Sequence, residues 1–202
     1  MRLFIQTFCL VLLTNQSAFA DEASGWLKTE IDFILNAYNN SSATNENRFL
    51  MIENTINYNF AGAGIAKFVA GKAWGGADKS TKKEYITSFK RHLALNVASM
   101  MQGYSNQEYT LINTKYDSKN KVSLIDMEIY NDTGNLVVTW RVKKSKDRYF
   151  VIDLLVADIS LVVTKRSEFN SMLKTVDYNL NEFHKLLKDQ NENSYKKIIK
   201  KN

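Results

Sequence analysis

A stretch of alternating apolar and polar residues between positions 109 and 156 limits the fold more than any other feature of the sequence. Four segments in it repeat with a period of two, which predicts β-strands. Polar clusters of hairpin length separate the segments, so we expect consecutive strands to pair antiparallel in a four-stranded meander. The predicted strands are residues 109–116, 122–130, 136–143 and 149–156.

One face of this predicted sheet is apolar. The residues expected on it are Ile125, Met127, Ile129, Val138, Trp140, Val142, Ile152, Leu154 and Val156. The residues expected on the opposite face are Asp126, Glu128, Arg141, Lys143 and Asp153. An apolar face must be covered by a second layer, and strand twist curls such a sheet so that it can leave a concave interior.

Helical periodicity is found on both sides of the strands. The predicted helices are residues 26–38, 49–60, 61–74 and 81–104 before the strands, and 161–176 and 178–188 after them. Thr81 and Glu84 have the spacing of a capping box, which predicts the start of the fourth helix. We attribute Gly62 and Gly64 of the third helix to close helix packing. A tight turn is expected at Ala157 and Asp158, directly before the fifth helix.

These elements predict an α+β fold. We expect helices packed on a curled, mainly antiparallel four-stranded meander sheet, forming an NTF2-like cone with an apolar cavity.

Residues 1–20 have the parts of a secretory signal peptide. Arg2 supplies the positive charge, residues 3–13 are the apolar core, and Ala18-Phe19-Ala20 is a cleavage site. The apolar core is too short for a bilayer, which takes about 20 residues. A lipoprotein is the alternative, with Cys9 lipidated, but Cys9 lies inside the apolar core. No cysteine follows, so the exported domain must be stabilised by its hydrophobic core alone.

We expect one domain over residues 21–190 and a basic, frayed tail over residues 191–202. The lysines of the tail are Lys196, Lys197, Lys200 and Lys201. They contribute to a net charge of +6 for the chain. Solvation explains such lysines, and weak attraction to an anionic membrane surface or an acidic partner is the alternative. Because export is expected, we do not expect the protein to bind nucleic acid.

Few residues in the sequence have catalytic or metal-binding chemistry. The histidines are His92 and His184, and neither has the spacing to cysteine or carboxylate residues that a metal site needs. Asp126 and Asp153 are candidates for acid–base chemistry, but alternation places them on the polar face. We predict no enzyme activity, no catalytic residue, no metal and no cofactor. A buried and unpaired Asp126 or Asp153 would favour an enzyme instead.

Residues 151–169 read VIDLLVADISLVVTKRSEF, an aspartate-containing strand, a short acidic turn, and a helix with a basic pair. Its informative residues are Asp153, Ser160, Leu161, Lys165, Arg166 and Phe169. A second segment covers residues 65–104, and its informative residues are Gly71, Trp74, Phe89, Leu93 and Tyr104. With Trp140 and Arg141, these segments resemble the MlaC family of periplasmic phospholipid-shuttle proteins, also called toluene-tolerance proteins.

The chain departs from the family pattern at three places. Asp158 stands where the family usually has glycine, and Val97 stands where an aromatic residue is frequent. The proline that is common near Asn57 is missing. Aspartate tolerates turn geometry better than most residues, so the first departure is compatible with the expected turn.

The resemblance implies a monomeric carrier in the periplasm of a Gram-negative bacterium, with phospholipid as its cargo. Family members hold acyl chains in a cavity between sheet and helices. They move lipid between an outer-membrane lipoprotein–porin complex and an inner-membrane ABC transporter with a substrate-binding ring, which maintains the lipid asymmetry of the outer membrane. A carrier of another apolar ligand, such as a hopanoid-like lipid, and a non-carrier interaction module of the envelope are the alternatives.

We expect the cavity to be lined by apolar residues from both the sheet and the helices. The candidates are Phe68, Phe89, Leu93, Val97, Met100, Met101, Ile125, Met127, Ile129, Val138, Trp140, Leu154, Val156 and Ile159. Each could equally be part of an ordinary packed core, because a cavity wall and a core use the same side chains.

Overall fold

The computed structural model describes residues 20, 22–104, 107–130 and 134–200. By its internal contacts the chain divides into two compact units. The sheet unit comprises the residues up to Phe33 together with Gln107–Asp158, and the helical unit comprises Ile34–Asn106 and Ile159–Asn202. Apart from Ala20, the predicted signal peptide lies outside the described residues. Whether the two units together form the single domain expected over residues 21–190 stays a prediction.

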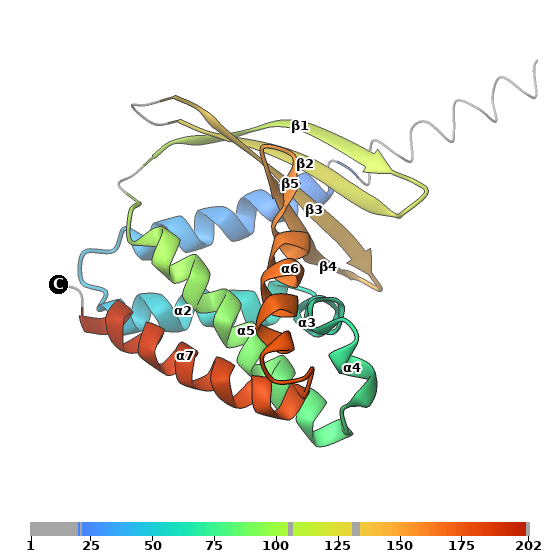
Figure 1. Cartoon of the computed structure of the whole chain (residues 1–202). Coiled ribbons are helices and arrows are strands. Elements are labelled where there is room, and N and C mark those ends of the chain that lie inside the picture. Colours follow the sequence, from blue (N-terminus) through green and yellow to red (C-terminus); the bar gives the residue numbers. More distant parts are fainter. Residues whose placement is uncertain (1–19, 21, 105–106, 131–133, 201–202) are drawn as a thin grey trace, which may run out of the picture. The chain divides into compact units, whose positions relative to one another are not determined.

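The strands form one sheet in which neighbours in sequence are neighbours in space (Figure 1). Its strands are β1 (Tyr109–Asp117), β2 (Val122–Ile129), β3 (Leu136–Ser145), β4 (Arg148–Val156) and the short β5 (Ile159–Ser160). Strands β1 to β4 pair antiparallel, which confirms the α+β class and the meander. The strand count was wrong by one, because β5 is too short to show alternation. The cone and its cavity stay predictions.

A β-bulge in β4 changes which residues share a face. Val142 of β3 pairs with Val151, whereas its neighbour Arg141 pairs with Asp153, so Ile152 is the extra residue. Val151 is 2% exposed and lies opposite Val142, so it occupies the apolar face at the point where we expected Ile152. The bulge shifts the alternation by one residue, and a period-two pattern cannot anticipate such an insertion.

The link between β4 and β5 is the tight turn expected at Ala157 and Asp158. Both residues have positive φ angles, 48° and 62°. Few residues other than glycine adopt this left-handed conformation, and aspartate is one that does so more readily. Asp158 therefore fits the turn in place of the glycine of the family pattern.

Helices make up the rest of the described chain. An N-terminal helix covers residues 22–38, and its residues up to Phe33 belong to the sheet unit. The other helices are α2 (Asn45–Asn59), α3 (Gly62–Ala70), α4 (Ala73–Gly76), α5 (Lys79–Met101), α6 (Leu161–Lys174) and α7 (Leu180–Lys200). The predicted third helix is thus two helices, because Gly71 between them has a φ of +56°.

Glycine packing in α3 was predicted correctly for only one of two residues. A Cβ on Gly62 would lie 2.8 Å from the side chain of Lys90 in α5, so the close packing there needs glycine. A Cβ on Gly64 would meet no other atom within 4 Å, so close packing does not explain that residue.

The start of α5 differs from the predicted capping box. Asp78, and not Thr81, is the N-cap residue, and its carboxylate accepts a 2.8 Å hydrogen bond from the backbone N–H of Thr81. The Thr81 hydroxyl donates to the same carboxylate at 2.9 Å. Aspartate is among the best N-cap residues and precedes the threonine, so the helix begins earlier than predicted, at Lys79.

The end of the chain is helical where we predicted a frayed tail. Helix α7 continues to Lys200, and Asn191 and Ile198 within it are 2% and 7% exposed. Ile198 packs in a cluster with Phe49 and Ile52 of α2. The buried Ile198 and the partly buried Tyr195 hold this end against α2, while Lys196, Lys197 and Lys200 remain exposed.

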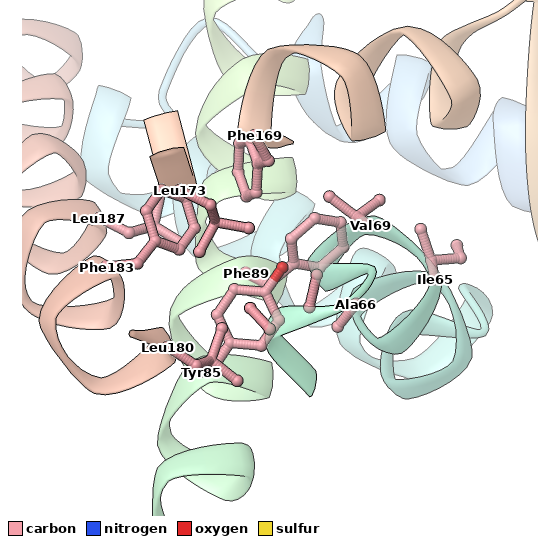
Figure 2. Packing of buried hydrophobic residues seen from close by; sticks show 12 residues of the cluster. Ile65, Ala66, Val69, Tyr85, Phe89, Phe169, Leu173, Leu180, Phe183 and Leu187 are labelled. Carbon is pink, nitrogen blue, oxygen red and sulfur yellow. The ribbon is translucent and has the colours of Figure 1, made fainter. Parts of the chain in front are cut away.

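The helical unit has an aromatic core. Figure 2 shows rings from three helices pointing toward one another: Tyr85 and Phe89 from α5, Phe169 from α6 and Phe183 from α7. Phe169 makes edge-to-face contacts with Phe89 and Phe183, with ring centroids 5.8 Å and 5.0 Å apart. All four side chains are fully buried. Edge-to-face aromatic pairs add stability beyond the burial of their surface, so these rings fix α5, α6 and α7 together.

Candidate functional site

The apolar face of the sheet unit brings seven of the predicted lining residues together. Ile125 pairs with Trp140 and Met127 pairs with Val138 across β2 and β3. The pairs continue into β4, where Leu154 lies opposite Trp140 and Val156 lies opposite Val138. Ile129 extends the same face at the end of β2. The result is a continuous apolar surface across three strands, as the alternation predicted.

Burial varies across this apolar face. Ile125 is fully buried, and Met127 and Val138 are each 6% exposed. Ile129, Trp140, Leu154 and Val156 are half-buried. Packing is therefore tight at its centre, and the half-buried residues keep accessible surface that a ligand could cover.

The first part of the N-terminal helix is anchored to this face at both ends. Glu22 accepts hydrogen bonds from Lys144 at 2.9 Å and from Tyr149 at 2.7 Å. These bonds hold the pKa of Glu22 below its ordinary value, with that from Lys144 having the larger effect. Ten residues along the helix, Asp32 accepts a hydrogen bond from Tyr109 of β1. Tyr109 pairs with Ile129, so both belong to the apolar face.

The helix turns its own apolar side inward. Ala23, Leu27 and Ile31 recur at intervals of four residues and are 0%, 1% and 9% exposed. Trp26 stacks on Tyr149 with ring centroids 5.7 Å apart. The sequence predicted the helical stripe but gave no sign of its partner, because Glu22 and Lys144 are 122 residues apart. A ligand on the apolar face would share it with this helix.

The other seven predicted lining residues lie in the helical unit. Phe68, Met100 and Ile159 are 42%, 65% and 63% exposed. Phe89, in contrast, is fully buried in the aromatic core. The residues that are half-buried against the helical clusters are Leu93, Val97 and Met101. These seven residues are not one surface of the helical unit, and their place in a lipid site stays a prediction.

Both histidines lie between α5 and α7. The Nδ1 atom of His92 is 3.3 Å from Oδ1 of Asn191, and burial, together with the charge of Lys165, lowers the pKa of His92 to about 4. The Nδ1 atom of His184 is 3.0 Å from the hydroxyl of Ser88, and Nε2 is 3.4 Å from Glu84. Burial also lowers the pKa of His184.

The serine, histidine and glutamate of this group are residue types that some hydrolases use. Ser88 is only 8% exposed, and its backbone carbonyl accepts a hydrogen bond from Asn191 at 2.8 Å. Its hydroxyl therefore lies inside a packed helix interface and not in a cleft. We assign the group to holding α5 against α7.

The carboxylates that would have favoured an enzyme have partners in the sheet unit. Asp153 lies on the face opposite to the apolar residues, as alternation predicted, but it is 4% exposed and therefore does not point into solvent. Arg141 forms an ion pair with it at 3.3 Å on the face opposite to Leu154. Asp126 accepts hydrogen bonds from Thr139 at 2.7 Å and from Asn113 at 3.2 Å. Neither carboxylate has the unpaired, buried environment expected of a general base.

Two absences hold for the described part of the chain alone. Within it, no three histidine, cysteine, aspartate or glutamate side chains are grouped so that they could hold a metal ion. Over the same residues, no helix has the length and the hydropathy needed to cross a membrane.

Comparisons with known proteins give one matching family and one similar fold. The model of the MlaC protein family matches residues 28–191. Among solved structures, the phospholipid-binding protein from Ralstonia solanacearum, in complex with a phospholipid, superposes with a TM-score of 0.72. It is 15% identical, and the match covers 86% of this chain and 98% of the Ralstonia chain. None of the curated proteins matches the chain in sequence.

Proposed function

Because this chain belongs to the MlaC family, we propose that it is a periplasmic protein that binds phospholipid. The observation that carries the proposal is the apolar face of the sheet unit, where Trp140, Leu154 and Val156 are half-buried around the buried Ile125 and Val138. Acyl chains need an apolar surface of this kind and no catalytic group. The phospholipid in the structure of the Ralstonia protein supports the same class of ligand.

We further propose that the protein carries lipid between the outer and inner membranes as the soluble component of an ABC-type transport system. Two acyl chains contain roughly 30 methylene groups, and each gains about 0.8 kcal/mol on leaving water. Unaided crossing of an aqueous space is therefore very slow. A bilayer and an apolar protein site offer similar environments, so loading and unloading are close to neutral in free energy. The direction of lipid transport must then come from the docking partners, which we propose are a lipoprotein–porin complex and an ABC transporter.

The seven sheet residues are the strongest candidates for contact with the acyl chains. They are Ile125, Met127, Ile129, Val138, Trp140, Leu154 and Val156. The seven candidates in the helical unit remain predictions from the sequence alone.

Leu154 and its neighbour Leu155 offer a matched test. Both are half-buried in β4, but Leu154 pairs with Trp140 on the apolar face and Leu155 pairs with Thr139 on the other. We expect Leu154→Glu to lower the amount of bound phospholipid several-fold, because a carboxylate on the apolar face must be desolvated by an acyl chain. Leu155→Glu should retain the lipid. Native mass spectrometry of protein purified from a periplasmic fraction gives the occupancy.

The outcome separates several functions. Equal occupancy in both variants would remove the apolar face from the lipid site, provided that circular dichroism shows both to be folded. Wild-type protein that neither contains lipid nor extracts it from vesicles would contradict phospholipid binding and favour an interaction module. A hopanoid-like lipid in the mass spectrum would keep the carrier and change its cargo.

A further inference from the structure

Trp140 carries a buried polar group without a partner on the apolar face. Among the described residues, the indole Nε1–H of Trp140 is buried and no protein atom accepts its hydrogen bond. The Tyr85 hydroxyl and Nε2 of His92 are in the same condition, but both lie in the helical unit. An indole N–H can only donate, and leaving it unsatisfied lowers stability. Its placement therefore needs an explanation.

The neighbours of Trp140 across the strands offer no acceptor side chain. Ile125 lies opposite it on β2, and Leu154 lies opposite it on β4. Val138, two residues earlier in β3, belongs to the same face and is apolar. An apolar ring in place of the indole would cover these neighbours without burying a polar atom. The N–H is therefore not required for packing the sheet.

The polar groups next to Trp140 in β3 are engaged on the other face. Thr139 donates its hydroxyl hydrogen bond to Asp126. Arg141 forms its ion pair with Asp153. The carboxylates of this part of the sheet thus have donors on the face opposite to Trp140, and the indole needs an acceptor that the sheet does not supply.

A bound phospholipid has two kinds of acceptor near its acyl chains. The phosphate is an anion, and its burial among apolar side chains costs far more than that of a neutral group. The ester carbonyl is neutral and is joined directly to the acyl chain that we place on this face. We infer that the Trp140 Nε1–H donates a hydrogen bond to an ester carbonyl oxygen of the bound phospholipid. This inference rests on the proposed function and names a polar contact within the same site.

Ester-linked and ether-linked lipids test this contact directly. Dialkyl phosphatidylglycerol keeps the phosphate, headgroup and chain length of the diacyl lipid but has no carbonyl. We expect wild-type protein to bind the diacyl lipid about fivefold more tightly, the effect of one ordinary hydrogen bond. Trp140→Phe should remove this preference, because the affinity for the diacyl lipid falls more than the affinity for the dialkyl lipid. Trp74→Phe, a half-buried tryptophan of the helical unit, is the control and should retain the preference.

Each other outcome contradicts the contact. Equal affinity of wild-type protein for the two lipids would show that no carbonyl is recognised. An equal loss for both lipids in Trp140→Phe would assign the N–H to the phosphate or to packing. Wild-type protein that binds neither lipid would contradict the proposed function itself, whereas one that binds both equally would contradict only this inference.

A second replacement keeps the test independent of folding. β-(3-Benzothienyl)alanine at position 140 has nearly the shape of tryptophan, with sulfur in place of the N–H. If Trp140→Phe is unstable, the protein with this replacement should still fold and should lose the preference for the ester lipid. A retained preference would show that the Trp140 N–H is not the donor.

Discussion

The helical unit and the sheet unit bury apolar residues in different ways. In the helical unit, rings from α5, α6 and α7 are fully buried and meet edge to face at centroid distances of 5.0 to 5.8 Å. In the sheet unit, branched and sulfur-containing side chains form one broad face, and several of its members are half-buried. A core of interlocked rings tolerates little change in volume. A partly covered face can accept a ligand without the protein repacking, so we assign stability chiefly to the first and binding to the second.

The two units also treat a buried polar side chain differently. His92 in the helical unit has a hydrogen bond at Nδ1, and its Nε2 has no partner among the described residues. Asp153 in the sheet unit is ion-paired with Arg141 and also accepts a 2.9 Å hydrogen bond from the backbone of Leu154. The first arrangement is favourable while the imidazole is neutral, and the second combines an ion pair with a backbone hydrogen bond.

Removing one aromatic ring should have the largest effect. We expect Phe169→Ala to lower the free energy of unfolding by about 3–5 kcal/mol, since the cavity left among rigid rings cannot close. Leu154→Ala on the half-buried face should cost only about 1 kcal/mol, because part of that side chain is already in contact with solvent. Urea unfolding curves of lipid-free protein give both values. Equal losses would end the distinction between a rigid core and a partly covered face.

Acidification should have the next largest effect, through His92. The pKa of His92 is about 4 in the folded protein and about 6.5 when exposed, so the unfolded chain binds the extra proton first. Stability is therefore complete above pH 6.5 and falls by about 3 kcal/mol as the pH decreases toward 4. Lys165 opposes protonation, and Glu168 and Asn191 favour it. Urea unfolding between pH 7 and 4.5 measures the slope.

His92→Asn is the matched control for this pH dependence. Asparagine keeps a donor toward Asn191 but does not titrate. Most of the loss in free energy of unfolding between pH 7 and 4.5 should therefore disappear in this variant. An unchanged slope would assign acid sensitivity to other groups, of which His184 and Glu84 are the first to examine.

Loss of the sheet ion pair should have the smallest effect of the three. Arg141→Met leaves the carboxylate of Asp153, which is 4% exposed, without its cation, and should cost about 2 kcal/mol. Adding Asp153→Asn should recover part of that loss, because the second change removes the buried charge. A double-mutant cycle by urea unfolding gives the coupling. Independent, additive losses would show that the pair is not a unit.

The strands were predictable to within a residue or two because alternation and turn clusters are local signals. The β-bulge at Ile152 was not, since an inserted residue has no signature in a period of two. The start of α5 was misplaced because Asp78 lies before the apolar pattern that located the helix. The helical residues up to Lys200 were missed because a single buried apolar side chain, Ile198, is a weak signal among lysines.

The candidate site was predictable only in part. Alternation identified the apolar face of the sheet correctly, because one face of an antiparallel sheet is read directly from every second residue. Sequence periodicity could not show that Phe89 is enclosed by rings from α6 and α7, whereas Trp140 has half-buried neighbours. That difference depends on contacts between segments far apart in the chain. The hydrogen bonds of Glu22 with Lys144 and Tyr149 are hidden from sequence for the same reason.

The order of the elements along the chain also affects folding. Helix α5 ends at Met101, but Phe169 and Phe183, which complete its aromatic core, come only after the four long strands. A chain that emerges from its N-terminus must therefore keep the side of α5 that faces α6 and α7 exposed until the strands have been delivered. Contacts of such long sequence separation slow folding and lengthen exposure to aggregation. Chains truncated before α6 should be captured by holdase chaperones, whereas the complete chain should escape them.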